Sequence, residues 1–124
     1  MNNWINLALG GMAGTFARYF LGGFVYRLLG TNFPYGTLMA NLSGCFLIGL
    51  FDGMAEVRFL IGPGGRLLLM TGFCGAYTTF STLMLETSNL MRDGEMVYAL
   101  LNFLGSGLAG FVLFKLGVYL GALV

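Results

Sequence analysis

The chain has 124 residues, of which 57% are hydrophobic and 9% are charged, and its formal net charge is +1 with no histidine present. In ordinary soluble domains about a quarter of the residues are charged, so this composition excludes a soluble globule and leaves one small membrane domain. The weak net charge gives no basis for binding nucleic acid. The missing histidine, together with the lack of a nucleophile and base set or a phosphate loop, argues against an enzyme.

Four stretches with almost no charge follow one another along the chain. Each is close to the roughly 20 helical residues that cross a hydrocarbon core of about 30 Å. They predict an all-α membrane protein with a single domain, residues 1–124, and transmembrane helices at about 4–28, 35–55, 66–90 and 96–121. The connecting segments are short, so neighbouring helices are expected to be antiparallel, with both termini on one side of the membrane.

The loops between these helices carry arginines in equal number on the two sides of the membrane. Arg58 and Arg66 lie on the side of the termini, and Arg27 and Arg92 lie on the other side. Lys and Arg in short loops normally set orientation, so this balance favours insertion in both directions and an antiparallel, dual-topology dimer of identical chains. The alternative is that Arg18 or Lys115 sets a single orientation.

The first predicted helix contains Arg18 deep within its apolar stretch. A guanidinium at such a depth is costly without a cavity, a partner or a route to the interface. Arg18 is therefore a candidate functional residue, or else it lies near the end of a tilted helix and reaches the interface.

Pairs of glycines four residues apart recur in three of the predicted helices. Such pairs let helices approach closely, either within one subunit or between two. The pairs are Gly10 and Gly14, Gly49 and Gly53, and Gly117 and Gly121.

The second and fourth predicted helices each carry polar side chains on one face. Asn41 shares a face with Thr37 and Gly44, and Asn102 shares one with Ser106. A carboxamide in hydrocarbon needs hydrogen-bond partners. These residues therefore either join helices or line an aqueous seam, in which the Asn41 amide would serve an anion.

The third predicted helix holds the densest group of polar residues, over residues 72–82. Glycines and consecutive β-branched threonines weaken a regular helix, so a break is expected at residues 75–82. Carbonyl groups freed by a break at membrane depth are suitable ligands for a hard cation such as Na⁺. The alternative is an intact helix in which Ser and Thr bond to the preceding turn. Glu86, one turn after Thr82, is expected to pair with an arginine or to cap polar groups.

These residues form motifs that resemble the Fluc (CrcB) family of fluoride channels over essentially the whole chain. The motifs are Gly14 and Arg18, then Gly36-Thr37-Leu38, Asn41 and Gly44, then Gly72-Phe73-Cys74-Gly75, Thr78-Thr79-Phe80-Ser81-Thr82 and Glu86. The resemblance implies passive, fluoride-selective export that lowers cytoplasmic fluoride toxicity, through a multi-pass protein of the cell (inner or plasma) membrane. It further implies an antiparallel homodimer with a third helix broken at mid-membrane, two pores and a central structural Na⁺ at the dimer interface.

The resemblance also assigns roles to individual residues. The backbone carbonyls of Gly75 and Thr78 would bind the Na⁺, and Arg18 would lie by a vestibule. Hydroxyl, amide and ring-edge donors would line the fluoride pathway: Asn41, Thr79, Phe80, Ser81 and Thr82. The ring edge of Phe80 carries the positive part of the aromatic quadrupole, so it can contact an anion without a full charge.

One position departs from the family pattern. Leu83 occupies the place where the family usually has a second phenylalanine. A leucine has no ring edge, which leaves three interpretations. Either one phenylalanine is enough for conduction, or conduction is impaired. In the third, the chain is a non-conducting partner subunit beside a differing chain in a heterodimeric fluoride channel. The other function considered is a proton-coupled cation exporter like those of the small multidrug resistance family. That chemistry needs a carboxylate in the first span, which here carries Arg18 instead.

Overall fold

The computed structural model describes residues 2–124, and within that range the chain forms helices and short loops without a β-strand. The first two helices match the first two predicted segments, and the last helix matches the fourth. The third segment consists of four consecutive pieces, one of them a π-helix. In chain order the elements are α1 (Asn3–Leu29), α2 (Tyr35–Glu56), α3 (Pro63–Gly65), the π-helix η1 (Arg66–Cys74), α4 (Gly75–Tyr77), α5 (Phe80–Arg92) and α6 (Met96–Leu123).

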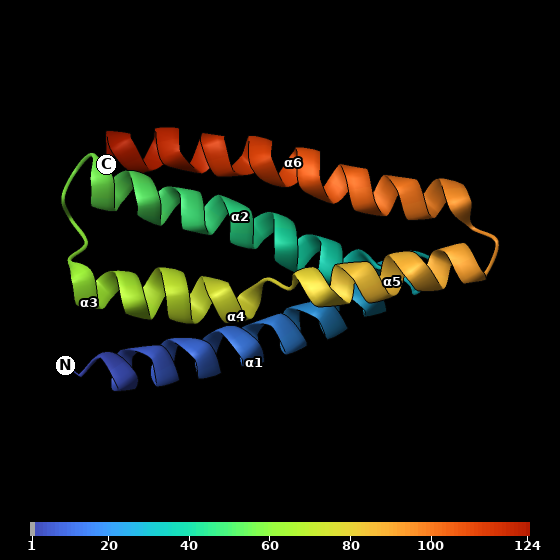
Figure 1. Cartoon of the computed structure of the whole chain (residues 1–124), viewed down its shortest axis with the longest axis horizontal. Coiled ribbons are helices and arrows are strands. Elements are labelled where there is room, and N and C mark those ends of the chain that lie inside the picture. The colour runs from blue at the N-terminus through green and yellow to red at the C-terminus, as the bar shows by residue number, and fades with distance from the viewer. Residues whose placement is uncertain (1) are drawn as a thin grey trace.

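The ends of these helices follow from local chemistry. The Asn2 side chain caps α1 by accepting a hydrogen bond from the Trp4 N–H at 2.7 Å. Gly30, which follows α1, has a φ of 86°, a left-handed conformation that glycine adopts without strain. Gly94 has a φ of 80° in the turn between α5 and α6. Tight turns of this kind make successive long helices antiparallel, and both termini lie at the same end of the molecule (Figure 1).

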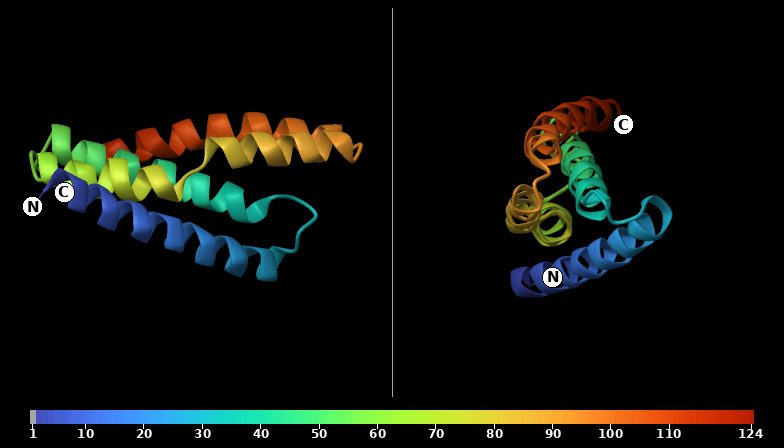
Figure 2. Two further views of the ribbon diagram at one scale, coloured as in Figure 1. Left: turned by 60° about the horizontal axis from the view of Figure 1, so that its bottom comes forward. Right: turned by 90° about the vertical axis from the view of Figure 1, so that its right-hand side faces the viewer.

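The long helices pack as neighbouring pairs. α2 packs against α6, and α1 packs against η1 and α4. The third segment changes its neighbour along its length, because η1 and α4 lie on α1 whereas α5 lies on α6. Figure 2 shows this change as a step in the chain between the yellow-green and the orange parts of the segment.

The glycine pairs make these close contacts within the subunit. A Cβ added at Gly49 would overlap the Phe114 carbonyl oxygen of α6, and one added at Gly117 would overlap the Phe46 carbonyl oxygen of α2. Gly10 and Gly14 lie in the same way against the backbone of η1. Of the two roles left open for the pairs, packing of helices within one subunit therefore accounts for all three pairs.

Several polar residues are buried and many large apolar residues are exposed, which is unusual for a soluble protein. Asn6, Asn41, Asn102 and Ser106 are buried, whereas large apolar side chains lie exposed along α1 and α6. An apolar surface of this extent requires a covering of lipid or protein. The distribution agrees with a helical membrane protein.

Length and composition identify three helices that can cross a membrane: Tyr35–Glu56, Pro63–Arg92 and Met96–Leu123. These three correspond to the second, third and fourth predicted spans and show a multi-pass membrane protein. α1 has 27 residues and is long enough, but it is less apolar because Asn6, Arg18 and Arg27 lie within it. A membrane-spanning α1 therefore stays a prediction.

Candidate ion pathway at the interrupted third segment

The helical backbone of the third segment is interrupted at Thr78 and Thr79. Thr78 has φ and ψ of −90° and 157°, Thr79 has −150° and 113°, and both are therefore extended. Two consecutive β-branched residues favour this backbone over a helix. The side chain of Thr78 donates to the Cys74 carbonyl at 2.9 Å, which closes the end of the preceding helix.

The hydroxyl groups predicted to serve an ion lie at the start of α5 and bond to one another. Thr79 Oγ1 accepts from the Thr82 N–H at 3.2 Å and donates to Thr82 Oγ1 at 3.0 Å. The Ser81 hydroxyl lies 3.4 Å from Thr79 Oγ1. Thr79 is thus the N-cap of α5, a local role that the family resemblance did not assign to it.

Asn41 of α2 pairs with the interrupted backbone. Its Oδ1 accepts from the Thr79 N–H at 2.7 Å, and its Nδ2 donates to the Thr79 carbonyl at 3.2 Å. Asn41 is buried, and its bond to the Thr79 N–H satisfies a backbone donor that has no helical partner, whereas the Thr79 carbonyl also accepts the first bond of α5. The amide therefore joins two helices, one of the two roles left open for it, and in the described part of the chain one hydrogen of its Nδ2 stays free for a further acceptor.

Four carbonyl groups at the interruption lose the donors that an α-helix would supply: those of Gly75, Ala76, Tyr77 and Thr78. The Gly75 carbonyl would accept from the Thr79 N–H, which bonds to Asn41, and the Thr78 carbonyl would accept from the Thr82 N–H, which bonds to Thr79 Oγ1. The Ala76 carbonyl accepts from Arg18 Nε at 3.1 Å instead. Within residues 2–124 no group of three or more Cys, Asp or Glu side chains could hold a metal ion, so a cation here would need carbonyl ligands. The free carbonyls of Gly75 and Thr78 fit a hard cation.

A cavity of about 370 Å³ lies beside the interruption. Six of the residues assigned by the family resemblance line it: Asn41, Gly75, Thr78, Thr79, Phe80 and Leu83. Phe80 is 72% exposed, whereas Leu83 is 8% exposed. The side chain at position 80 is therefore open at the surface of the subunit, and the side chain at position 83 is buried within it. Ser81, Thr82 and Arg18 do not line this cavity.

Ser106 of α6 lines the same cavity and was not among the assigned residues. Its Oγ is buried and has no hydrogen-bond partner within residues 2–124. Asn102, one turn earlier, donates to the Thr87 hydroxyl at 3.1 Å and so joins α6 to α5. Of the two polar residues that share this face of α6, Asn102 therefore joins two helices and Ser106 lines the cavity.

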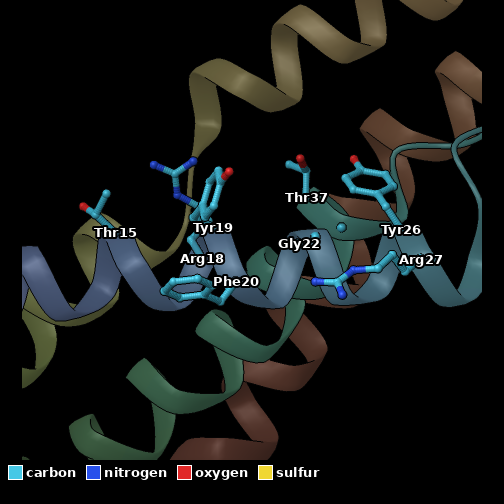
Figure 3. Close-up of a pocket in the computed structure, with 10 residues that line it drawn as sticks. Thr15, Arg18, Tyr19, Phe20, Gly22, Tyr26, Arg27 and Thr37 are labelled. Carbon is cyan, nitrogen blue, oxygen red and sulfur yellow. The ribbon is translucent and has the colours of Figure 1, made fainter.

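Arg18 lines a second cavity, of about 530 Å³, between α1 and the start of α2. Tyr26, Arg27 and Thr37 also line it. In Figure 3, Arg18 and Tyr26 extend from the same side of α1, whereas Arg27 lies on a different side. The arginine therefore has both a backbone partner and a cavity, which accounts for its depth in the helix.

Glu86 is held by two hydroxyl groups from two other helices. Tyr26 donates to its Oε2 at 3.3 Å, and Thr37 donates to its Oε1. An arginine partner, one expectation for Glu86, is not present within residues 2–124. Tyr26 was not predicted from the sequence, although Arg18, Gly22 and Tyr26 follow one another at intervals of four residues and so lie on one side of α1.

This combination of helices, buried amides and an interrupted segment beside a cavity defines a small multi-pass membrane protein with a polar seam. The family model described as "CrcB-like protein, Camphor Resistance (CrcB)" matches residues 5–118. The chain belongs to this family, which confirms the resemblance seen in its motifs.

Relatives of nearly the same length have one name, "Fluoride-specific ion channel FluC". The protein of Maridesulfovibrio salexigens is 41% identical over 124 residues, covering 100% of this chain and 98% of the relative. That of Chlorobaculum tepidum is 50% identical over 110 residues, covering 89% of this chain and 86% of the relative. That of Nitratidesulfovibrio vulgaris is 43% identical over 124 residues, covering 100% of both chains. The relatives are therefore named as ion channels rather than enzymes.

Proposed function

We propose that the chain is a fluoride-selective ion channel that lets fluoride leave the cell passively and so lowers its toxicity in the cytoplasm. The observation that carries this proposal is the 41% identity, over the full chain, to a relative named a fluoride-specific ion channel. The chemistry of the cavity supports it, because the cavity offers neutral donors rather than a full positive charge. A small, strongly hydrated anion needs such donors to replace its water, and weak binding lets it leave again.

Three donors can act on the anion in succession. Among residues 2–124 the buried Ser106 hydroxyl finds no partner and Asn41 has one amide hydrogen free, and the ring edge of Phe80 is exposed at the cavity. Thr79 and Thr82 act indirectly, since their hydroxyl groups fix the start of α5 and hence the place of Phe80. Ser81, on the exposed side of this turn, adds a further hydroxyl to the pathway.

A structural Na⁺ at the carbonyls of Gly75 and Thr78 belongs to the same proposal. Its support is that the N–H groups which would bond to these carbonyls in a helix bond elsewhere. The ion would supply positive potential that favours an anion nearby. Arg18, in the neighbouring cavity, would add to this potential from a vestibule.

The proposed assembly is an antiparallel, dual-topology homodimer in the cell (inner or plasma) membrane, with α1 as a fourth span and the interruption at mid-membrane. The equal number of loop arginines on the two sides supports insertion in both directions. The apolar faces of α1 and α6 offer surface to lipid and to a second copy. Leu83 is the basis for an alternative assembly, in which this chain pairs with a differing subunit that supplies the missing phenylalanine ring.

Fluoride efflux from liposomes tests the function directly. The purified chain should release fluoride and scarcely any chloride, and equal leakage of both ions would reject a selective channel. Efflux that appears only after a second family member is added would instead show the partner-subunit role. Gel filtration and cross-linking of the same sample then separate homodimer from heterodimer.

A further inference from the structure

Arg18 bonds directly to the interrupted third segment. Its Nε donates to the Ala76 carbonyl at 3.1 Å, across 58 residues of sequence. The other N–H groups of the guanidinium have no protein partner within residues 2–124 and border the 530 Å³ cavity. In Figure 3 the guanidinium lies beside the ribbon of the third segment rather than at the open end of α1.

The Ala76 carbonyl needs this donor. In a continuous helix it would accept from the Phe80 N–H, but the chain becomes extended at Thr78 and Thr79. A free carbonyl away from water is costly, and the carboxyl end of a helix favours a positive charge. Arg18 provides both the donor and the charge at this one atom.

Ala76 lies between the two residues whose carbonyls are proposed to bind the cation. On one side is Gly75 and on the other, across Tyr77, is Thr78. Fixing the peptide group of Ala76 limits the rotation of its neighbours, and with it the direction in which both carbonyls point. Asn41 fixes Thr79 in the same way from α2, so the interruption is held from two sides.

We infer that Arg18 is a positioning residue, which sets the geometry of the interruption through its Nε rather than serving only as a charge that attracts anions. The inference rests on the proposed function where flux is the readout. Without Arg18 the backbone at residues 76–80 has additional freedom, so both the carbonyl pair and the start of α5 lose their fixed direction.

Two substitutions separate the hydrogen bond from the charge. In Arg18→Gln the side-chain amide nitrogen lies as many bonds from Cα as the arginine Nε, so the donor is kept and the charge is lost. In Arg18→Lys the charge is kept, but a methylene occupies the place of Nε. Arg27→Gln is the matched control, because Arg27 lines the same cavity and its replacement by glutamine removes the same charge.

Hydrogen exchange of the full chain in lipid nanodiscs gives a readout that does not depend on flux. A charged hydrogen bond contributes enough that its loss should speed exchange of the Thr78, Thr79 and Thr82 amides about tenfold in Arg18→Lys. Arg18→Gln should stay within about threefold of the unmodified chain, and Arg27→Gln should not differ from it. Fluoride efflux should follow the same order, with Arg18→Gln retaining more flux than Arg18→Lys.

The opposite order would overturn the inference. If Arg18→Lys keeps protection and flux while Arg18→Gln and Arg27→Gln lose flux alike, Arg18 acts through its charge. If the unmodified chain carries no fluoride at all, the proposed channel function fails, while the exchange rates still decide the role of Arg18.

Discussion

Asn41 offers the sharpest test of how the interruption is held. Replacing it with alanine removes two hydrogen bonds and leaves the N–H of Thr79 unpaired, whereas the Thr79 carbonyl keeps its donor in the first turn of α5. A buried group left without a partner costs about 1–3 kcal/mol, which is the cost expected for the Thr79 N–H. Asn102→Ala is the matched control, because it removes the same atoms from a buried site but only one bond, to the Thr87 hydroxyl.

Both substitutions create similar cavities, so the difference between them reports the additional unpaired backbone group. We expect the free energy of unfolding in detergent to fall by about 2 kcal/mol more in Asn41→Ala than in Asn102→Ala. Fluoride efflux from liposomes should fall at least about tenfold in Asn41→Ala, because α5 and Phe80 lose their anchor. Equal losses of stability in the two variants, or full flux in Asn41→Ala, would refute this account of the interruption.

Three further substitutions test other parts of the structure. Leu83→Phe adds a ring edge beside the cavity and should raise the rate of fluoride efflux several-fold without admitting chloride; an unchanged rate would deny the ring a part in permeation. Gly14→Ala places a Cβ on the Phe73 carbonyl and should lower the free energy of unfolding by about 1–3 kcal/mol, whereas Gly11→Ala, with open space around it, should leave it unchanged. Glu86→Gln replaces a charged acceptor of two hydroxyls and should lower the same quantity by about 1–2 kcal/mol, with the exposed Glu95→Gln as a neutral control; equal values would show that the two bonds contribute little.

Apolar length located the helical segments in the sequence, because a membrane-spanning backbone must satisfy its own hydrogen bonds within a helix. It did not reveal the nine-residue π-helix of η1, since so short a run shows no distinct period. Glycine spacing indicated close packing but not which helices meet. That depends on contacts such as Gly14 with Phe73, far apart along the chain.

The site was predictable in composition but less so in its bonds. The family motifs named Asn41, Phe80 and the threonines, and most of these residues line one cavity. The capping role of Thr79 is local, and the preference of threonine for the N-cap could have indicated it. The bond between Arg18 and Ala76 was not predictable, because a backbone carbonyl has no signature in the sequence.

The change of neighbour along the third segment has a mechanical consequence. The chain before Thr78 packs on α1, and the chain after Thr79 packs on α6. Within the third segment these two residues have torsions that no helical ladder restrains, so a tilt of its first part against its second part is taken up there. A lipid or a second subunit that presses on α1 would therefore act from a distance on the backbone that lines the cavity, through these two residues.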